Sequence, residues 1–151
     1  MVIQRFQREP LNGFVNMGTL LRPDGLEVLT PSGTVSLLPW TEVKIVRFVR
    51  DFDSHDADAG RTAFLSRPRV DGVWVKVAFT DGDTLEGVMP NNLLHMEAEG
   101  VYLTPPDSAV RIFVPRSALT SVQVLGVVGG PLTKNRRKPA APKAQIGLFE
   151  A

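Results

Sequence analysis

The stretch VWVKVAFTDGDTLEGVM, residues 73–89, decides the expected fold. In residues 73–79 every second side chain is valine or phenylalanine, which is the period of a β-strand with one buried face. Residues 80–83 have the composition of a tight turn, and the apolar run 84–89 follows them. The stretch therefore predicts an antiparallel β-hairpin.

Three further strands are expected after this hairpin. Val101–Thr104 and Val110–Val114 are short apolar runs on either side of Pro105-Pro106-Asp107, which breaks regular structure. Pro115–Ala118 is too short for an α-helix and suits one 3₁₀ turn, and Leu119–Leu125 follows as the fifth strand. Five short strands with a one-turn break before the last are typical of a small, strongly bent barrel of the SH3 or Sm kind.

The first fifty residues repeat this pattern. Phe6 aligns with Phe79, Gly13 with Gly87 and Pro39 with Pro115, so the offset drifts only between 73 and 76 residues. This periodicity predicts two tandem copies, residues 2–49 and 73–126. The alternative is that two unrelated five-strand segments align loosely through their alternating residues, and a shared strand order would decide between the two interpretations.

The expected fold is all-β, with two tandem small five-stranded SH3/Sm-like barrels and a flexible basic C-terminal tail. The expected divisions are a first barrel at 1–50, an acidic linker at 51–72, a second barrel at 73–126 and a tail at 127–151. Lys and Arg number 17 and Asp and Glu 16, and residues 131–151 hold five of these cations and one of these acids. The tail therefore carries a charge of +4 and the rest of the chain −3.

Composition limits the class of protein. Hydrophobic residues form 43% and charged residues 22% of the chain, as in soluble globular proteins, and 12 prolines and 13 glycines disfavour long helices. The absence of cysteine excludes disulfides, thiol chemistry and zinc sites built on thiolate. Because we find no signal peptide and no apolar stretch of membrane-spanning length, we expect a cytoplasmic protein without a membrane partner.

No pattern of side chains indicates catalysis, a metal or a cofactor. Nucleophilic catalysis needs a Ser or Cys beside a His, but His55 falls in the linker and His95, after an apolar pair, is expected to be half buried. Asp51–Gly60 lacks the ligand spacing of an EF-hand calcium loop, and Gly126–Gly130 lacks the Lys-Ser/Thr of a phosphate-binding loop. We therefore expect a protein that is not an enzyme, with Gly126–Gly130 as the hinge before the tail.

Two resemblances concern the body of the chain. The second copy resembles the first motif of Sm-like proteins, Gly-x-x-apolar-x-Gly, here Gly82–Gly87, which implies a small barrel that binds RNA. Phe113–Ser117 lacks the basic or His-containing second motif of those proteins. The body is also similar to an uncharacterised bacterial family with the pattern V-x-x-x-F-x-D-G-x-x-L-E-G followed by R-I-F-V, here Val75–Gly87 and Arg111–Val114. That resemblance implies a fold and a bacterial origin but no activity.

The last seven residues, Gln145–Ala151, resemble the peptide motif that binds the bacterial sliding clamp, in which Leu-Phe follows a Gln by three and four positions. The resemblance implies an adaptor that presents this peptide to a protein partner, with partner-binding residues Gln145, Ile146, Leu148 and Phe149. Burial of the Leu and Phe side chains contributes about 3–6 kcal/mol before the cost of ordering the tail is subtracted. Two alternatives stay open: a fold-back of these residues as an extra strand on a barrel edge, and a chain end without a role.

A second function is suggested by four cations close together in the tail, Lys134, Arg136, Arg137 and Lys138. Contacts between these side chains and phosphates would give weak, salt-sensitive, sequence-independent binding to nucleic acid, with a Kd of roughly 10⁻⁴–10⁻⁶ M. A barrel face of the Sm-like kind would assist. The acidic body opposes such binding, and charge runs are also common in solvated tethers.

Overall fold

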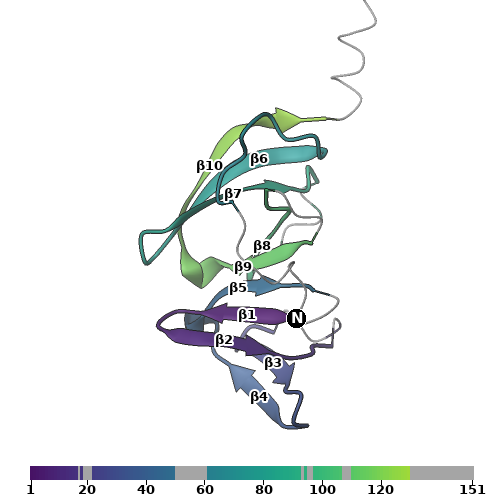
Figure 1. The fold of residues 1–151 in the computed structure, drawn as a ribbon, viewed down its shortest axis with the longest axis vertical. Helices are drawn as coiled ribbons and strands as arrows, with labels where there is room; N and C mark the ends of the chain where they lie inside the picture. Colours follow the sequence, from purple (N-terminus) through teal and green to yellow (C-terminus); the bar gives the residue numbers. More distant parts are fainter. Residues whose placement is uncertain are drawn as a thin grey trace, which may run out of the picture.

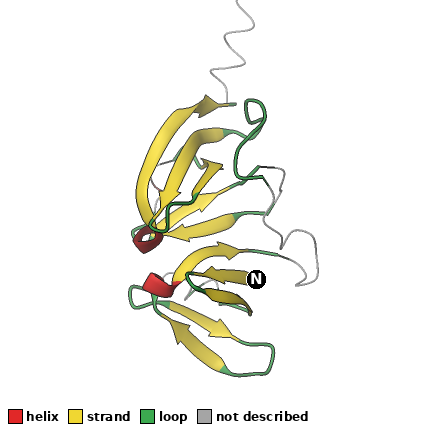
Figure 2. Cartoon of the chain, turned by 60° about the vertical axis from the view of Figure 1, so that its left-hand side comes forward, coloured by secondary structure: helices red, strands yellow, loops and turns green. Residues whose placement is uncertain are grey.

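The computed structural model describes residues 1–16, 18, 22–49, 61–92, 94, 97–106 and 110–129, and these residues contain ten β-strands (Figures 1 and 2). The first half consists of β1 (Val2–Arg5), β2 (Arg8–Asn12), β3 (Leu26–Leu29), β4 (Val35–Leu38), the 3₁₀ turn η1 (Trp40–Glu42) and β5 (Val43–Arg47). The second half consists of β6 (Gly72–Phe79), β7 (Thr84–Met89), β8 (Gly100–Leu103), β9 (Ile112–Pro115), the 3₁₀ turn η4 (Arg116–Ala118) and β10 (Leu119–Val128). The prediction of an all-β chain is confirmed.

The pairing of strands is the same in both halves. In the first half β1 pairs antiparallel with β2 and β5, and β3 pairs with β4. In the second half β6 pairs antiparallel with β7 and β10, and β8 pairs with β9. A single bridge continues each half from its second to its third strand, Phe14 with Leu29 and Val88 with Thr104. Both halves thus have the strand order 5-1-2-3-4, and a shared order is what the internal repeat predicts.

The register of these pairs identifies the residues that correspond between the halves. Val43 and Leu119, each the first residue after a 3₁₀ turn, lie opposite Arg5 and Phe79. Phe79 therefore corresponds to Arg5, and the alignment of Phe79 with Phe6 is wrong by one residue in the first strand. Such a slip exchanges the two faces of a strand. The sequence permits this misalignment because Val2 and Ile3 are both apolar, so an apolar residue lies on the core face in either alignment of the first strand.

The halves are joined by strand pairing rather than closed separately. β5 pairs with β1 on one edge and with β9 on the other, which gives the five-stranded sheet β2-β1-β5-β9-β8 in the middle of Figure 1. The other two sheets are β10-β6-β7 and β3-β4. All three sheets are open, so two separate closed barrels are not found among the described residues. The physical reason is that β5 pairs with the second half instead of closing against β4.

Each half also contributes a side chain to the core of the other. The core of the first half contains Phe113 of β9, and that of the second half contains Ile45 of β5. The first core consists of Met1, Ile3, Leu26, Val28, Leu38, Val43, Val46 and Phe113. The second consists of Ile45, Val75, Val77, Phe79, Leu85, Leu103, Ile112, Val114 and Ala118. A module of about fifty residues buries little apolar surface alone, and the exchange of side chains enlarges both cores.

Two expected boundaries need correction. β10 runs to Val128, so Gly126 lies inside a strand, and the hinge expected at Gly126–Gly130 does not begin there. Of the expected linker, residues 61–71 form no helix or strand but lie along the second half: the Glu86 amide donates to the Thr62 carbonyl at 2.7 Å, and the Arg67 guanidinium donates to the Val127 carbonyl at 2.6 Å. Asp51–Gly60 lies outside the described residues.

Candidate functional site: the outer face of the β3–β4 hairpin

The β3–β4 hairpin has one buried and one exposed apolar face. Leu26, Val28 and Leu38 point into the core of the first half. The alternation of the strands places four other side chains on the opposite face, where Val35 is 62% and Leu37 is 48% exposed. We call this surface the outer face; it consists of Phe14, Glu27, Leu29, Val35 and Leu37. Exposed apolar side chains gathered in this way mark interaction surfaces.

The outer face borders a shallow hollow. Its volume is about 360 Å³, and it is lined by Phe14, Val15, Asn16, Glu27, Leu29 and Val35. Two backbone hydrogen bonds between Phe14 and Leu29, both of 2.8 Å, hold one wall of the hollow against β3. Four of the six lining residues are apolar, so this hollow is suited to an apolar side chain.

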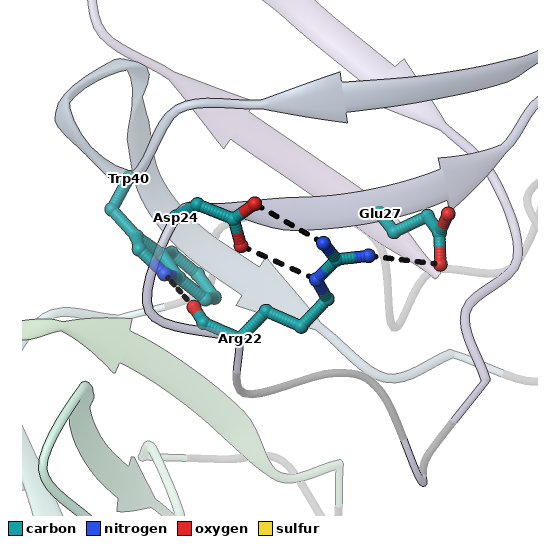
Figure 3. A network of polar contacts seen from close by, with 4 residues as sticks. All are labelled: Arg22, Asp24, Glu27 and Trp40. Carbon is teal, nitrogen blue, oxygen red and sulfur yellow. Dashed lines mark hydrogen bonds and ion pairs between the residues drawn. The ribbon is translucent and has the colours of Figure 1, made fainter.

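A polar network fixes the turn that leads into β3 (Figure 3). The Arg22 guanidinium donates to both carboxylate oxygens of Asp24, at 3.2 and 3.1 Å, and lies 3.9 Å from Glu27. The Trp40 indole N–H donates to the Arg22 carbonyl at 2.6 Å, which ties this turn to η1. Arg22 therefore lies beside Glu27, the one carboxylate of the outer face.

The corresponding face of the second half is covered. Tyr102 and Phe113 occupy the positions of Glu27 and Leu37, since each pair lies directly opposite across the third and fourth strands. The Phe113 ring lies 5.7 Å from the ring of Trp40 and 5.0 Å from that of Tyr102, and Phe48 packs 6.2 Å from Tyr102. The surface of the second half that corresponds to the outer face is therefore buried in the contact between the two halves.

An ionic contact adds to this interface between halves. The Lys44 ammonium donates to Asp81 at 2.7 Å and to Asp83, and it lies 5.0 Å from the centre of the Phe79 ring. Burial by itself lowers the pKa of Lys44, but the hydrogen bonds and charges of the two aspartates outweigh it and raise that pKa. The hydrogen bond from Lys44 lowers the pKa of Asp81. The sequence places the two aspartates in a turn, but no local pattern in it indicates that Lys44 is their partner.

Arg47 is a second cation at this interface and, unlike the half-buried Lys44, is buried. Its side chain is 6% exposed, and its Nε atom has no hydrogen-bond partner among the described residues. Burial lowers the pKa of the guanidinium. Arg47 lies between Val2 of β1 and Ile112 of β9. The sequence does not mark its burial, because β5 contains two cations, Lys44 and Arg47, and nothing in their spacing shows which of them is buried.

The site residues expected from the sequence lie outside the described part of the chain. These are Gln145, Ile146, Leu148 and Phe149 of the terminal peptide and Lys134, Arg136, Arg137 and Lys138 of the basic run. His55 and His95 also lie outside it. Within the described residues, no three His, Asp or Glu side chains are placed to hold a metal ion, and no helix is long and apolar enough to cross a membrane.

Comparison with known proteins gives a family but no activity. Neither a characterised protein nor a solved structure shows significant similarity to this chain. One family model matches residues 1–126, which include all of the first half and most of the second. The chain belongs to this family of unknown function, DUF6982.

Proposed function

We propose that the protein is a non-enzymatic adaptor that presents its C-terminal peptide to a protein partner, with a bacterial DNA sliding clamp as the first candidate. The observation that carries the proposal is the string Gln145–Phe149, which follows the folded body across a Pro-containing, basic segment. Leu148 and Phe149 supply the apolar contact, Ile146 adds to it, and Gln145 makes a partly solvated amide hydrogen bond worth about 0.5–1.5 kcal/mol.

Within this proposal the body is a rigid carrier built from two small barrels of the SH3 or Sm kind. The shared strand order and the 3₁₀ turn before the last strand of each half support that assignment. In this proposal the barrels are open ones, since all three sheets of the described residues are open.

The test compares clamp binding and thermal unfolding in one variant of the full chain. The double substitution Leu148→Ala and Phe149→Ala is expected to abolish retention of the protein on immobilised clamp and to leave the Tm unchanged, because a tethered peptide adds nothing to the core. Gln145→Ala is expected to weaken binding by less. Thr133→Ala with Pro139→Ala, two substitutions outside both the peptide and the basic run, serves as the control.

The fold-back alternative gives the opposite pattern. Two buried apolar side chains removed from a sheet edge would lower stability by several kcal/mol, and the wild-type protein would not bind clamp. A lowered Tm together with absent wild-type binding would end the adaptor proposal.

A second candidate function rests on the basic run Lys134, Arg136, Arg137 and Lys138. If this run binds nucleic acid, binding to labelled DNA or RNA weakens steeply with salt and is lost when the four cations are replaced by Gln. The same variant is expected to retain clamp binding, so the two functions are separable in one chain.

A further inference from the structure

The contact between the two halves has a defined register. β5 pairs antiparallel with β9, Val46 opposite Phe113 and Arg47 opposite Ile112, and the Phe48 amide donates to the Arg111 carbonyl at 3.2 Å. The fifth strand of the first half thus pairs with the fourth strand of the second. Val46 and Phe113 are both completely buried.

Both strands have counterparts in the opposite halves. Val46 lies opposite Ile3, and Val122 of β10 lies opposite Val77, which corresponds to Ile3. Both fifth strands also carry an irregularity after their first residues, opposite the end of β1 and the end of β6. Val122 therefore corresponds to Val46, and Leu37 of β4 corresponds to Phe113.

These counterparts lie on edges that have no strand partner among the described residues. β10 pairs only with β6, and β4 pairs only with β3. Val122 is 43% and Leu37 is 48% exposed, whereas their equivalents at the contact between halves are completely buried. The chain therefore has two free edges, β10 and β4, that correspond to the two strands, β5 and β9, that pair with each other inside the molecule.

We propose that the chain associates head-to-tail with further copies of itself, β10 of one copy pairing antiparallel with β4 of the next. The internal register places Val122 opposite Leu37 and Gln123 opposite Ser36. In this arrangement Leu37 enters the exposed side of the second core, as Phe113 enters the first. The outer face of the β3–β4 hairpin is then covered by the neighbouring copy.

The composition of the two edges favours this pairing. Free edge strands usually carry charged residues or proline, which block pairing with other chains. Leu119–Val128 and Val35–Leu38 contain neither. Both edges instead expose apolar side chains, including Val124 and Val35.

Charge complementarity supports the same register. The side chains that surround Phe113 internally are Trp40, the first residue of η1, and Tyr102. Their counterparts around Leu37 are Arg116, the first residue of η4, and Glu27. In this register Arg116 of one copy and Glu27 of the next flank Leu37 as opposite charges, in the places where Trp40 and Tyr102 flank Phe113 internally.

The pairing uses different surfaces on the two copies, so it extends beyond a dimer. Such heterologous contacts form rings when the rotation between copies closes and open chains when it does not. The proposal is independent of the terminal peptide and concerns only the folded body.

Sedimentation of the full chain tests the proposal. The wild type is expected to show a mean mass that rises above the 16.5 kDa monomer with concentration. Leu37→Lys and Val122→Lys each place a charge at the contact and are expected to raise the dissociation constant about tenfold or more. Val127→Lys makes the same change on β10 outside the predicted register, at a residue that is 54% exposed, and is expected to behave as the wild type.

A mixing experiment identifies the head-to-tail arrangement. The Leu37→Lys variant keeps an intact β10 and the Val122→Lys variant keeps an intact β4, so an equimolar mixture is expected to form heterodimers that grow no further. A Leu37→Lys variant that still self-associates as strongly as the wild type overturns the proposal, because pairing between two β10 strands would explain it. A wild type that stays monomeric also overturns it. If the wild type is monomeric but the Leu148→Ala, Phe149→Ala variant associates, the chain's own tail covers the free strand edge in the wild type. That outcome also overturns the proposal for the intact chain.

Discussion

At the scale of single residues, Lys44 shows how one side chain joins two parts of the chain. Its ammonium contacts two aspartates of the β6–β7 turn and the Phe79 ring, although it belongs to β5. Lys44 lies at an irregularity in β5: the neighbouring residues Val43 and Ile45 pair with Arg5 and Gln4, and Lys44 between them has no paired residue in β1. Spacing in the sequence gives the faces of β5 but not this irregularity, so the ionic contact was not predictable.

The Lys44–Asp81 contact predicts a specific dependence of stability on pH. Because the pKa of Asp81 is lowered, its contribution is present above the usual Asp pKa of about 3.9 and is lost as the pH falls through the lowered value. Because the pKa of Lys44 is raised, its contribution is lost only as the pH rises past that raised value. Asp81→Asn is expected to lower the free energy of unfolding by about 0.5–1 kcal/mol near neutral pH.

Urea titrations across the pH range check this prediction. The difference between wild type and Asp81→Asn should be constant around neutrality and shrink below about pH 4. Lys44→Met should remove the difference, while Lys76→Met, at an exposed lysine of β6, should retain it. A pH-independent difference would show that the aspartate acts through the turn alone.

At the scale of strands, the sequence predicted the elements well and their partners less well. Alternation along 73–79 predicts β6, and Pro115–Ala118 predicts the 3₁₀ turn before β10. The pairing of β5 with β9 was not predictable, because apolar periodicity reports which face of a strand is buried and not which strand lies at its edge. The core position of Phe113 follows from that pairing and was missed for the same reason.

Two matching glycines permit the close approach of the second strand to the third in each half. A Cβ atom at Gly13 would overlap the Val28 side chain, and one at Gly87 would lie 3.0 Å from Leu103 Cβ. Gly13→Ala is expected to lower the free energy of unfolding by about 1–3 kcal/mol, and Gly87→Ala by less, because the latter contact is looser. Gly126→Ala, whose Cβ would meet only Trp74 at 4.0 Å, is the matched control. Equal denaturation midpoints for all three variants would contradict this account.

At the scale of the whole molecule, the exchange of side chains predicts that the two halves unfold as one unit. Phe113 is completely buried in the core of the first half although its strand belongs to the second, and Ile45 makes the reverse contribution. The sequence predicts a linker at 51–72 and a separate barrel on each side of it. That division overlooks the interface, because the residues that form it are spread over η1, β5, the β6–β7 turn, β8 and β9.

The last prediction concerns this cooperativity. The chain has two tryptophans, Trp40 in the first half and Trp74 in the second, so each half has its own fluorescent reporter. In each single-tryptophan protein, Trp40→Phe and Trp74→Phe, we expect the midpoint seen by the remaining tryptophan to coincide with the midpoint of the same protein followed by far-UV circular dichroism. Phe113→Ala is expected to destabilise the protein by about 3–5 kcal/mol and to shift both reporters together, because its ring fills the core of one half from a strand of the other.

Leu103 gives the matched comparison. It is completely buried, but it lies in the core of the second half and in its own strand β8. If the halves were independent, Leu103→Ala would shift the transition seen by Trp74 and leave the one seen by Trp40 in place. Coincident shifts in both reporters, for Leu103→Ala as well as for Phe113→Ala, are the result expected of a single cooperative unit. Separate midpoints would show that β5–β9 pairing is too weak to couple the halves, and the same pairing between chains would then be too weak to hold an assembly together.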